Sequence, residues 1–317
     1  MIPPFCVLIG LAGQGKTRGT AAYNYISLCT NQSIAAILPN DKYDSLYLYY
    51  VVDSKYDYLR LLSSGDGGRG GLNKNLLNSL EIVFPKTIAE QRAIAEALSD
   101  IDGLIAALDK KIAKKRLIKQ GAMQQLLTGK KRLPGFTDSW VEKKLGEILD
   151  YEQPQPYLVV STDYVDSGIP VLTAGKSWIL GYTTEQFGIY NKLPVIIFDD
   201  FTTDSKYISY PFKVKSSAMK VLSLKNNDYD LRLVYELMQQ IDFPLKDHQR
   251  YWISEYSQLT ISIPKDREEQ TAIATILTDM DKEIADLEAK RDKYSLLKSG
   301  MMQKLLTGQI RLKINRI

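Results

Sequence analysis

The sequence has few of the side chains from which most catalytic and metal sites are built. Its 317 residues include two cysteines, Cys6 and Cys29, and a single histidine, His248. So few soft ligands exclude a zinc site, and a buried free thiol is the default state of each cysteine. His248 lies near Asp247 and Arg250 without a serine or cysteine elbow, so the combination for nucleophilic hydrolysis is missing as well. We expect no catalytic residue and no metal ligand.

Long apolar runs and a strong charge of one sign are also missing. No apolar stretch approaches the eighteen or more residues of a membrane span, and residues 1–5 lack the basic region of a signal peptide. A net charge of +4, with 25% charged and 44% apolar residues, is ordinary for a soluble protein. We therefore expect a cytoplasmic protein without membrane contact, long enough for two domains.

A duplicated segment organises the chain. Residues 82–133 align without gaps on residues 261–312, 179 positions later, with about half of the positions identical. A match of this length does not arise by chance, so it indicates an internal duplication. The shared skeleton is Pro85, Glu90-Gln91, Asp100, Asp102, Met123-Gln124 and Leu126-Leu127-Thr128-Gly129, then Pro264, Glu269-Gln270, Asp279, Asp281, Met302-Gln303 and Leu305-Leu306-Thr307-Gly308.

Each copy has the pattern of a long helix. Apolar residues recur at alternating spacings of four and three, a heptad seam typical of a helix that packs along another. Pro85 and Pro264 precede the helices, and Gly129 and Gly308 are natural stops. We expect the two helices to pack on each other, antiparallel, rather than separately on their own domains. The pairing residues would be Ile94, Leu98, Ile101, Ile105 and Leu108 with Ile273, Leu277, Met280, Ile284 and Leu287.

The segments between the helices have a different composition. Residues 134–260 are rich in Tyr, Thr, Val, Ile and Ser, which predicts a mostly β domain with one helix near residues 231–240. Residues 1–81 are similar but about fifty residues shorter. The predicted fold class is α+β, with mostly β domains joined by two long antiparallel coiled-coil-like helices. The predicted boundaries are 1–85 for a partial first domain, 86–130 for the first helix, 131–263 for a complete second domain and 264–312 for the second helix.

A phosphate-binding loop is the strongest competing motif. Gly10–Thr17 fits the P-loop pattern in full, and Val195–Asp200 resembles the strand that holds a magnesium aspartate. This is the alternative of a nucleotide-binding protein. Against it, Gly19 falls in the first turn of the helix that such a loop must open, and the repeat places Gly10 and Phe198 at equivalent positions of two different domains. A loop between two strands would contradict nucleotide binding.

The order of these elements resembles that of a known family. A β domain, a long helix that starts Pro-x-x-x-x-Glu-Gln and ends Leu-Leu-Thr-Gly, and then both again, is similar to the specificity subunits of type I restriction–modification systems. The run Arg132–Phe136, followed by Trp140 and Lys144–Gly146, looks like the usual entry to the second recognition domain. Gly13–Gly19 also resembles a stretch inside such domains. The resemblance covers essentially the whole chain.

The resemblance implies a reader of DNA without chemistry of its own. In that family two target-recognition domains each read half of a split sequence in double-stranded DNA, and the paired helices set the distance between the halves. Two methyltransferase subunits, which use S-adenosylmethionine, dock around the reader, and restriction subunits add cleavage driven by ATP. The chain itself would hold no cofactor.

One departure from the family concerns the first domain, since members start with a complete one. This chain would be a fragment of a shuffled gene or a partner for a separately encoded first half. A fragment that occupies methyltransferase subunits without directing them would act as an inhibitor, and the sequence does not separate this alternative from an active reader.

Basic and aromatic residues in predicted loops are the candidate DNA contacts, because such side chains bind phosphates and base edges. A basic cluster in residues 110–119 would follow DNA phosphates or only solvate its helix. The candidates are Lys16, Arg18, Arg69 and Lys74 in the first domain, with Gln14 and Asn73 beside them, and Lys176, Trp178, Lys206, His248 and Arg250 in the second.

Overall fold

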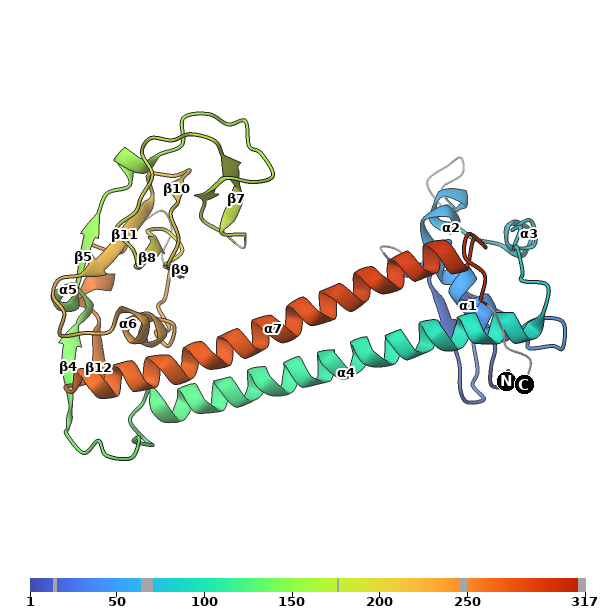
Figure 1. Cartoon of the computed structure of the whole chain (residues 1–317), viewed down its shortest axis with the longest axis horizontal. Coiled ribbons are helices and arrows are strands. Elements are labelled where there is room, and N and C mark those ends of the chain that lie inside the picture. Colours follow the sequence, from blue (N-terminus) through green and yellow to red (C-terminus); the bar gives the residue numbers. More distant parts are fainter. Residues whose placement is uncertain (14–15, 64–70, 176, 246–249, 313–317) are drawn as a thin grey trace. The chain divides into compact units, whose positions relative to one another are not determined.

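The structure, a computed structural model, describes residues 1–13, 16–63, 71–175, 177–245 and 250–312 of the chain. The chain divides into two units: the first comprises residues 1–114 and 285–317, and the second comprises residues 115–284. Two long helices contribute to both units, because each passes from one into the other (Figure 1).

The long helices are α4, Ile88–Leu126, and α7, Arg267–Leu305, with 39 residues each. Both are followed by a glycine with positive φ, 66° at Gly129 and 73° at Gly308, a backbone conformation that favours glycine and ends a helix. An ion pair of 2.7 Å joins Asp102 to Lys298 in the first unit, and one of 2.6 Å joins Lys119 to Asp281 in the second. An early residue of one helix thus meets a late residue of the other, which confirms the antiparallel pairing.

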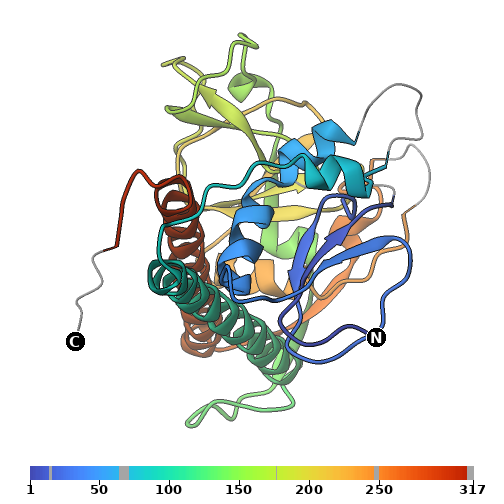
Figure 2. The same cartoon turned by 90° about the vertical axis from the view of Figure 1, so that its right-hand side faces the viewer.

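The first unit carries a three-stranded antiparallel sheet in the order β2-β1-β3. Its strands are β1, Val7–Gly10, β2, Ala21–Tyr23, and β3, Ile34–Ile37. Helices α1, Ser45–Ser54, α2, Tyr56–Leu62, and α3, Lys74–Asn78, follow. Leu48 and Val52 of α1 pack on Val7 and Ile9 of β1, so the helix covers the sheet (Figure 2).

The helices of the first unit are not what its composition indicates. The run Ser45–Ser54 holds aromatic and β-branched residues that are typical of strands. It is helical because the side chain of Asp44 caps the first turn, accepting from the backbone N–H of Tyr47 at 2.9 Å, and because its apolar side chains are buried between the sheet and α4. The strands among the described residues of this unit therefore all lie within residues 7–37.

The described residues of the second unit form three sheets. The four-stranded antiparallel sheet has the order β5-β11-β8-β9, a smaller sheet has the order β10-β6-β7, and β12 pairs with β4. Helix α6, Leu231–Met238, lies where the sequence indicates one. The other elements are β4 (Trp140–Lys144), α5 (Leu145–Ile148), β5 (Leu149–Glu152), η1 (Gln155–Tyr157), β6 (Ile169–Leu172), β7 (Ile179–Thr183), β8 (Val195–Asp199), β9 (Ser205–Ile208), β10 (Lys213–Val214), β11 (Met219–Leu224), η2 (Tyr256–Gln258) and β12 (Thr260–Pro264).

Part of this arrangement occurs in both units. Strand β1 is central between β2 and β3, as β8 is central between β9 and β11, and each third strand leads to a helix, α1 or α6. The register agrees as well, since Leu8 opposes Ala36 and the matching Ile196 opposes Leu222. The equivalence of Gly10 and Phe198 that the sequence indicates, which also relates Leu8 to Ile196, therefore holds in the sheets.

Burial along the helix seam is greatest where a third helix joins the pair. Leu98 is fully buried among Tyr47 and Tyr50 of α1, and Leu277 is fully buried in a cluster that contains Leu233 of α6. Between these ends Ile105 is only half-buried. Of the ten candidate pairing residues, Ile94, Leu98, Ile101, Ile273, Leu277 and Ile284 are buried, and Ile105, Leu108, Met280 and Leu287 are half-buried.

Candidate nucleic-acid interface

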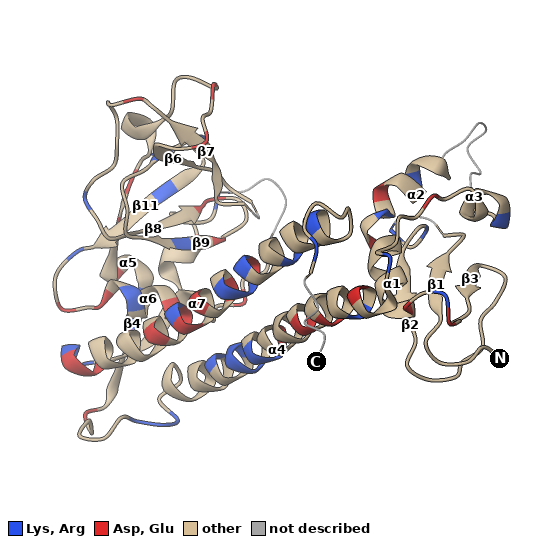
Figure 3. Cartoon of the chain, turned by 45° about the vertical axis from the view of Figure 1, so that its right-hand side comes forward, with Lys and Arg blue, Asp and Glu red and all other residues tan. Residues whose placement is uncertain are grey.

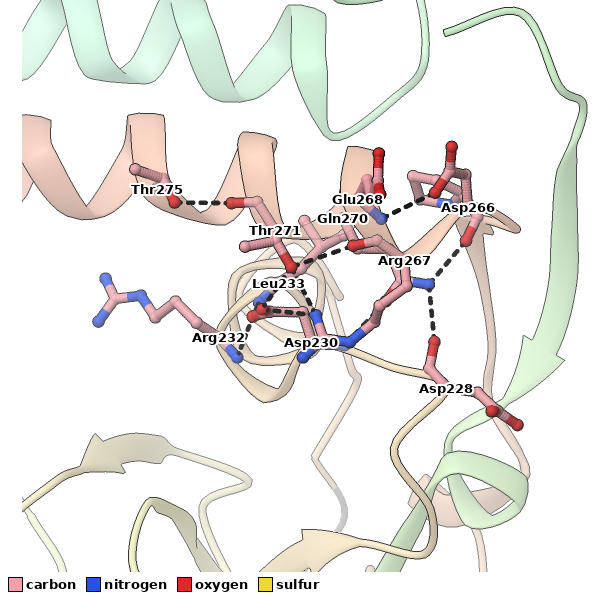
Figure 4. A network of polar contacts seen from close by, with 11 residues as sticks. Asp228, Asp230, Arg232, Leu233, Asp266, Arg267, Glu268, Gln270, Thr271 and Thr275 are labelled. Atoms are coloured by element: carbon pink, nitrogen blue, oxygen red, sulfur yellow. Dashed lines mark hydrogen bonds and ion pairs between the residues drawn. The ribbon is translucent and has the colours of Figure 1, made fainter.

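The second unit is held to its helices by a glutamine at the start of α7. The side-chain oxygen of Gln270 accepts from the backbone N–H of Asp230 at 2.8 Å, and its amide donates to the carbonyl of Pro264 at 2.8 Å. Asp230 is the N-cap of α6 and also pairs with Arg267 at 2.7 Å (Figure 4). The start of α6, the end of β12 and the start of α7 are thereby joined by one buried amide.

The first unit contains the same arrangement. Gln91 accepts from the backbone N–H of Asp44 at 2.8 Å and donates to the carbonyl of Pro85 at 3.1 Å, and Asp44 caps α1. We call each set, Asp44, Pro85 and Gln91 or Asp230, Pro264 and Gln270, the glutamine anchor. The two anchors explain why the glutamine and the proline belong to the duplicated skeleton.

Each glutamate next to the anchor glutamine binds an arginine that follows the Leu-Leu-Thr-Gly end of the other helix. Arg132 holds both oxygens of Glu269 at 2.6 and 2.7 Å, and Arg311 holds both oxygens of Glu90 at 2.6 and 2.5 Å. The hydrogen bond from Arg311 holds the pKa of Glu90 below its usual value, and the bond to Glu269 raises the pKa of Arg132. Such bidentate pairs fix the orientation of the two side chains as well as neutralising their charges.

The paired aspartates of the skeleton have the same kind of role. Asp102 accepts from the hydroxyl of Tyr50 at 2.9 Å besides binding Lys298, and Asp281 accepts from Arg232 at 2.6 Å besides binding Lys119. The skeleton residues therefore connect each domain to the helix pair.

A cation and an aromatic ring stand together at one end of the second unit's main sheet. Arg250 is exposed and lies 5.8 Å from the ring centre of Phe201, which is itself 43% exposed. Buried Asp200 holds this pair in place, because it accepts from the backbone N–H of Trp252 at 2.8 Å and pairs with buried Lys220 at 3.2 Å. An exposed guanidinium on a rigid base of this kind can bind a phosphate or a guanine edge.

A charged recess of about 480 Å³ lies in the second unit between β9, α6 and the helices. Lys206 of β9 is exposed at its edge, and Arg232 and Lys119 line it together with Glu236 and Asp281. Both inner cations are half-buried and paired with carboxylates, whereas Lys206 is exposed to solvent. Figure 3 shows basic residues on β9 and along α4.

The remaining candidates of the second unit are less informative. Trp178 is half-buried against the cluster that contains Leu172, so part of its ring serves the core. Lys176 and His248 lie outside the described residues. The basic cluster on α4 is partly committed to helix pairing, since Lys115 binds Glu283 at 2.7 Å.

Two candidates of the first unit, Lys16 and Arg18, lie in the loop that follows β1, and a third, Lys74, begins α3. Lys16 and Lys74 are exposed and Arg18 is half-buried, whereas Gln14 and Arg69 lie outside the described residues. Asn73 caps α3 by accepting from the N–H of Leu76 at 2.9 Å, so it has a structural role.

This loop also decides the question of nucleotide binding. Gly10 and Gly19 close it by a backbone hydrogen bond of 2.8 Å, and it joins the antiparallel strands β1 and β2. A phosphate-binding loop must open a helix after its lysine, and here the residues after Thr17 turn into β2 instead. The interpretation of Gly10–Thr17 as a P-loop is therefore wrong.

Sequence reasoning missed the buried ion pairs that support the surface. Asp199 and Asp200 resemble metal ligands in sequence but make contacts within the protein. Asp199 accepts from the backbone N–H of Phe201 at 3.1 Å in the turn after β8, and Asp200 pairs with Lys220. Lys213 is fully buried and binds Glu185 at 2.5 Å. Only an unusual lysine inside an apolar strand, as at Lys220 in β11, could have suggested such a pair.

A family model described as the type I restriction modification DNA specificity domain matches residues 7–115 and 137–294. The chain belongs to this family. The EcoR124I/EcoR124II specificity subunit of Escherichia coli is 51% identical over 148 residues, which are 45% of this chain and 36% of that protein. The MjaVIII specificity subunit of Methanocaldococcus jannaschii is 24% identical over 318 residues, covering 85% of this chain and 71% of that protein. The family predicted from the duplicated skeleton is confirmed.

The fold agrees with this membership. A crystal structure of a type I restriction–modification S subunit from M. genitalium superposes with a TM-score of 0.75 at 17% identity, covering 96% of this chain and 83% of that one. The α+β class with two long antiparallel helices is thereby confirmed. Among the helices that the structure describes, none is long and apolar enough to cross a membrane.

Proposed function

We propose that the chain is the DNA-reading subunit of a type I restriction–modification complex and that its second unit reads one half of a bipartite site. The proposal is supported by family membership and by one structural observation. The duplicated motif residues connect domains to helices, so they leave the exposed Arg250–Phe201 pair and Lys206 available for another molecule.

The second unit is suited to this role because its recognition surface rests on buried pairs. Asp200 and Lys220 are each about 2% exposed or less, so the turn that carries Phe201 and the segment that carries Arg250 share a rigid support. Rigid support matters because base readout requires bidentate geometry, whereas a phosphate contact tolerates displacement.

Other subunits would supply the chemistry. We infer that two methyltransferase subunits dock on the chain and that restriction subunits join them, as the family resemblance implies. The chain would contribute position only and bind no cofactor. The alternative is a chain that occupies methyltransferase subunits without directing them to DNA.

Co-expression with a type I methyltransferase subunit tests the proposal. Methylated positions in the cellular DNA should define one sequence pattern, and Arg250→Ala should weaken or relax it at one half. Lys293→Ala, which removes an exposed lysine of α7 in the first unit, is the control and should leave the pattern unchanged. A complex that assembles with the wild-type chain but methylates nothing would favour the inhibitor instead.

A further inference from the structure

One segment of the second unit closes two sheet edges. From Trp140 to Lys144 it pairs as β4 with all five residues of β12, and from Leu149 to Glu152 it pairs as β5 with β11. Leu145 and Ile148, between these strands, are fully buried. We call residues 140–152 the closing segment.

The first unit has both receiving edges. Residues 81–85 stand 179 positions before β12 in the duplication, and β3 occupies the place of β11 beside the central strand. Among the described residues, no strand pairs with 81–85 or with the second edge of β3, and no backbone–backbone hydrogen bond reaches residues 81–84. Unpaired edges of this kind readily accept another strand.

A groove of about 600 Å³ lies along Glu81 and Val83, two of the residues that take the place of β12. Val51, Val83, Met302 and Leu306 line it, and Val83 is 75% exposed. The duplication relates Met302 and Leu306 to Met123 and Leu127, which in the second unit belong to the core cluster that contains Trp140 and Leu145.

The two helix-ending glycines show the same difference. A side chain built on Gly129 would meet the ring of Trp140 at 3.5 Å, so the tryptophan lies directly on this glycine. A side chain built on Gly308 would meet no described atom within 4 Å. No described residue of the first unit therefore fills the space that corresponds to that of Trp140 in the second.

The chemistry of the groove selects its occupant. Thr260 opposes Lys144 in the second unit, and Glu81 takes the place of Thr260 in the first. A basic residue at the fifth position of an added strand would then face a carboxylate, a favourable cross-strand pair. The open glycine favours an aromatic residue at the first position. Leu38, 54% exposed at the end of β3, would be covered by the second strand.

We propose that this groove binds a closing segment supplied by a partner polypeptide: an aromatic residue, a strand ending in lysine, a Leu-Gly turn and a second strand. The described residues hold one such segment, and both of its strands are paired in the second unit. A second copy would have to release Trp140 from its own core, so it is the less favourable donor. This site binds polypeptide rather than DNA, and the inference goes beyond the proposed function.

A synthetic peptide with the sequence of residues 139–152 tests the inference against the full-length chain. We expect saturable binding by fluorescence anisotropy and about tenfold slower amide exchange at residues 81–85 and 35–38. Replacing the peptide's tryptophan by alanine should weaken binding about tenfold, because the ring would leave Gly308 uncovered. A scrambled peptide is the control.

A charge exchange tests the register. Glu81→Lys should weaken binding of the peptide about threefold, and a peptide with glutamate at the position of Lys144 should restore it in that variant. To exclude simple weakness, the same sequence can be tethered after residue 317 by a flexible linker, which raises its effective concentration. The tether should raise the melting temperature of the first unit by several degrees, and a scrambled tether should not.

Two results would overturn the inference. The first is absence of protection at residues 81–85 with both the free and the tethered peptide. The second is protection of these residues without any peptide, increasing with protein concentration alongside dimer formation, because the occupant would then be a second copy of the chain.

Discussion

The two units use the same anchor but differ in how completely the sheet behind it is built. In both, a glutamine joins a helix N-cap to the proline that precedes the long helix, at 2.8 Å from Asp44 and from Asp230. Among the described residues, a closing segment is present in the second unit alone, whose core cluster extends from Leu126 to α6. A duplicated anchor can therefore hold domains of different extent, because it contacts the helix cap and the proline before the long helix rather than the central strands β1 and β8.

Replacing a buried leucine of a long helix by alanine should have the largest effect on stability. Leu98 and Leu277 are equivalent and both fully buried, and replacing a buried leucine by alanine costs about 3 kcal/mol. We expect Leu277→Ala to lower the free energy of unfolding of the second unit by that amount. Tryptophan fluorescence measures this unfolding, since all three tryptophans lie in this unit. Leu117→Ala, at a residue 68% exposed on α4, is the control. Equal stability of Leu277→Ala and wild type would show that packing along the helix seam does not stabilise the second unit.

The arginine pairs should rank next. Arg132→Ala leaves the carboxylate of Glu269, 1% exposed, without its bidentate partner, which we expect to cost about 2 kcal/mol of the second unit's stability. Arg311→Ala should cost the first unit less, because Arg311 is more exposed than Arg132. Urea denaturation measures both. A larger loss from Arg311→Ala would reverse the predicted ranking of the two arginine–glutamate pairs.

Acid should weaken both units through single glutamates. Hydrogen bonds from Lys213 and Arg311 hold the pKa of Glu185 and of Glu90 below their usual value. A folded-state pKa below the unfolded one gives stability that is present above the unfolded pKa, about 4.3, and is lost as pH falls through the folded pKa. Glu185→Gln and Glu90→Gln should flatten the stability profile in this acidic window, each in its own unit. Profiles as steep as wild type would contradict the assignment.

DNA binding should change less, and only in the second unit. If Arg250 contacts a phosphate, Arg250→Ala lowers affinity for all sequences and reduces the salt dependence, whereas loss of a base contact costs about 1–3 kcal/mol at one position. Titration of the assembled complex with specific and unrelated DNA at several salt concentrations distinguishes these outcomes. Unchanged binding to both would remove Arg250 from the interface.

For ATP binding we expect no effect of substitution at all. Lys16 lies in a hairpin loop rather than before a helix, so we expect no specific ATP binding to the isolated chain and no change in Lys16→Ala. Isothermal titration with ATP checks this, and saturable binding that the substitution removes would contradict the hairpin argument.

The sequence predicted what repeats and missed what depends on distant contacts. Heptad spacing, Pro85 and Pro264, and the terminal glycines indicate the long helices because these signals are local. Helix α1 was not predicted, since its aromatic residues become helical only through the cap at Asp44 and packing on α4. Nor was the glutamine anchor, because its partners lie 47 and 40 residues away at unequal spacing.

The candidate site was predicted only in part for the same reason. Arg250 and Lys206 were predicted as cations of loops, which is wrong for Lys206 because it lies on strand β9. The support of Arg250 by Asp200 and Lys220 was not predicted, because it requires strands β8 and β11 to be neighbours. The P-loop motif failed because a sequence pattern does not reveal whether a strand or a helix follows it.

A domain exchange in the assembled methyltransferase tests the central claim most directly. Residues 134–260 are replaced by the matching domain of a relative with both helices kept, residues 1–81 are exchanged in a parallel chain, and the methylated sequences of cells are mapped. We predict that the first exchange changes one half of the methylated sequence and leaves its spacer length unchanged. An unchanged sequence after the exchange of residues 134–260 would contradict recognition by the second unit.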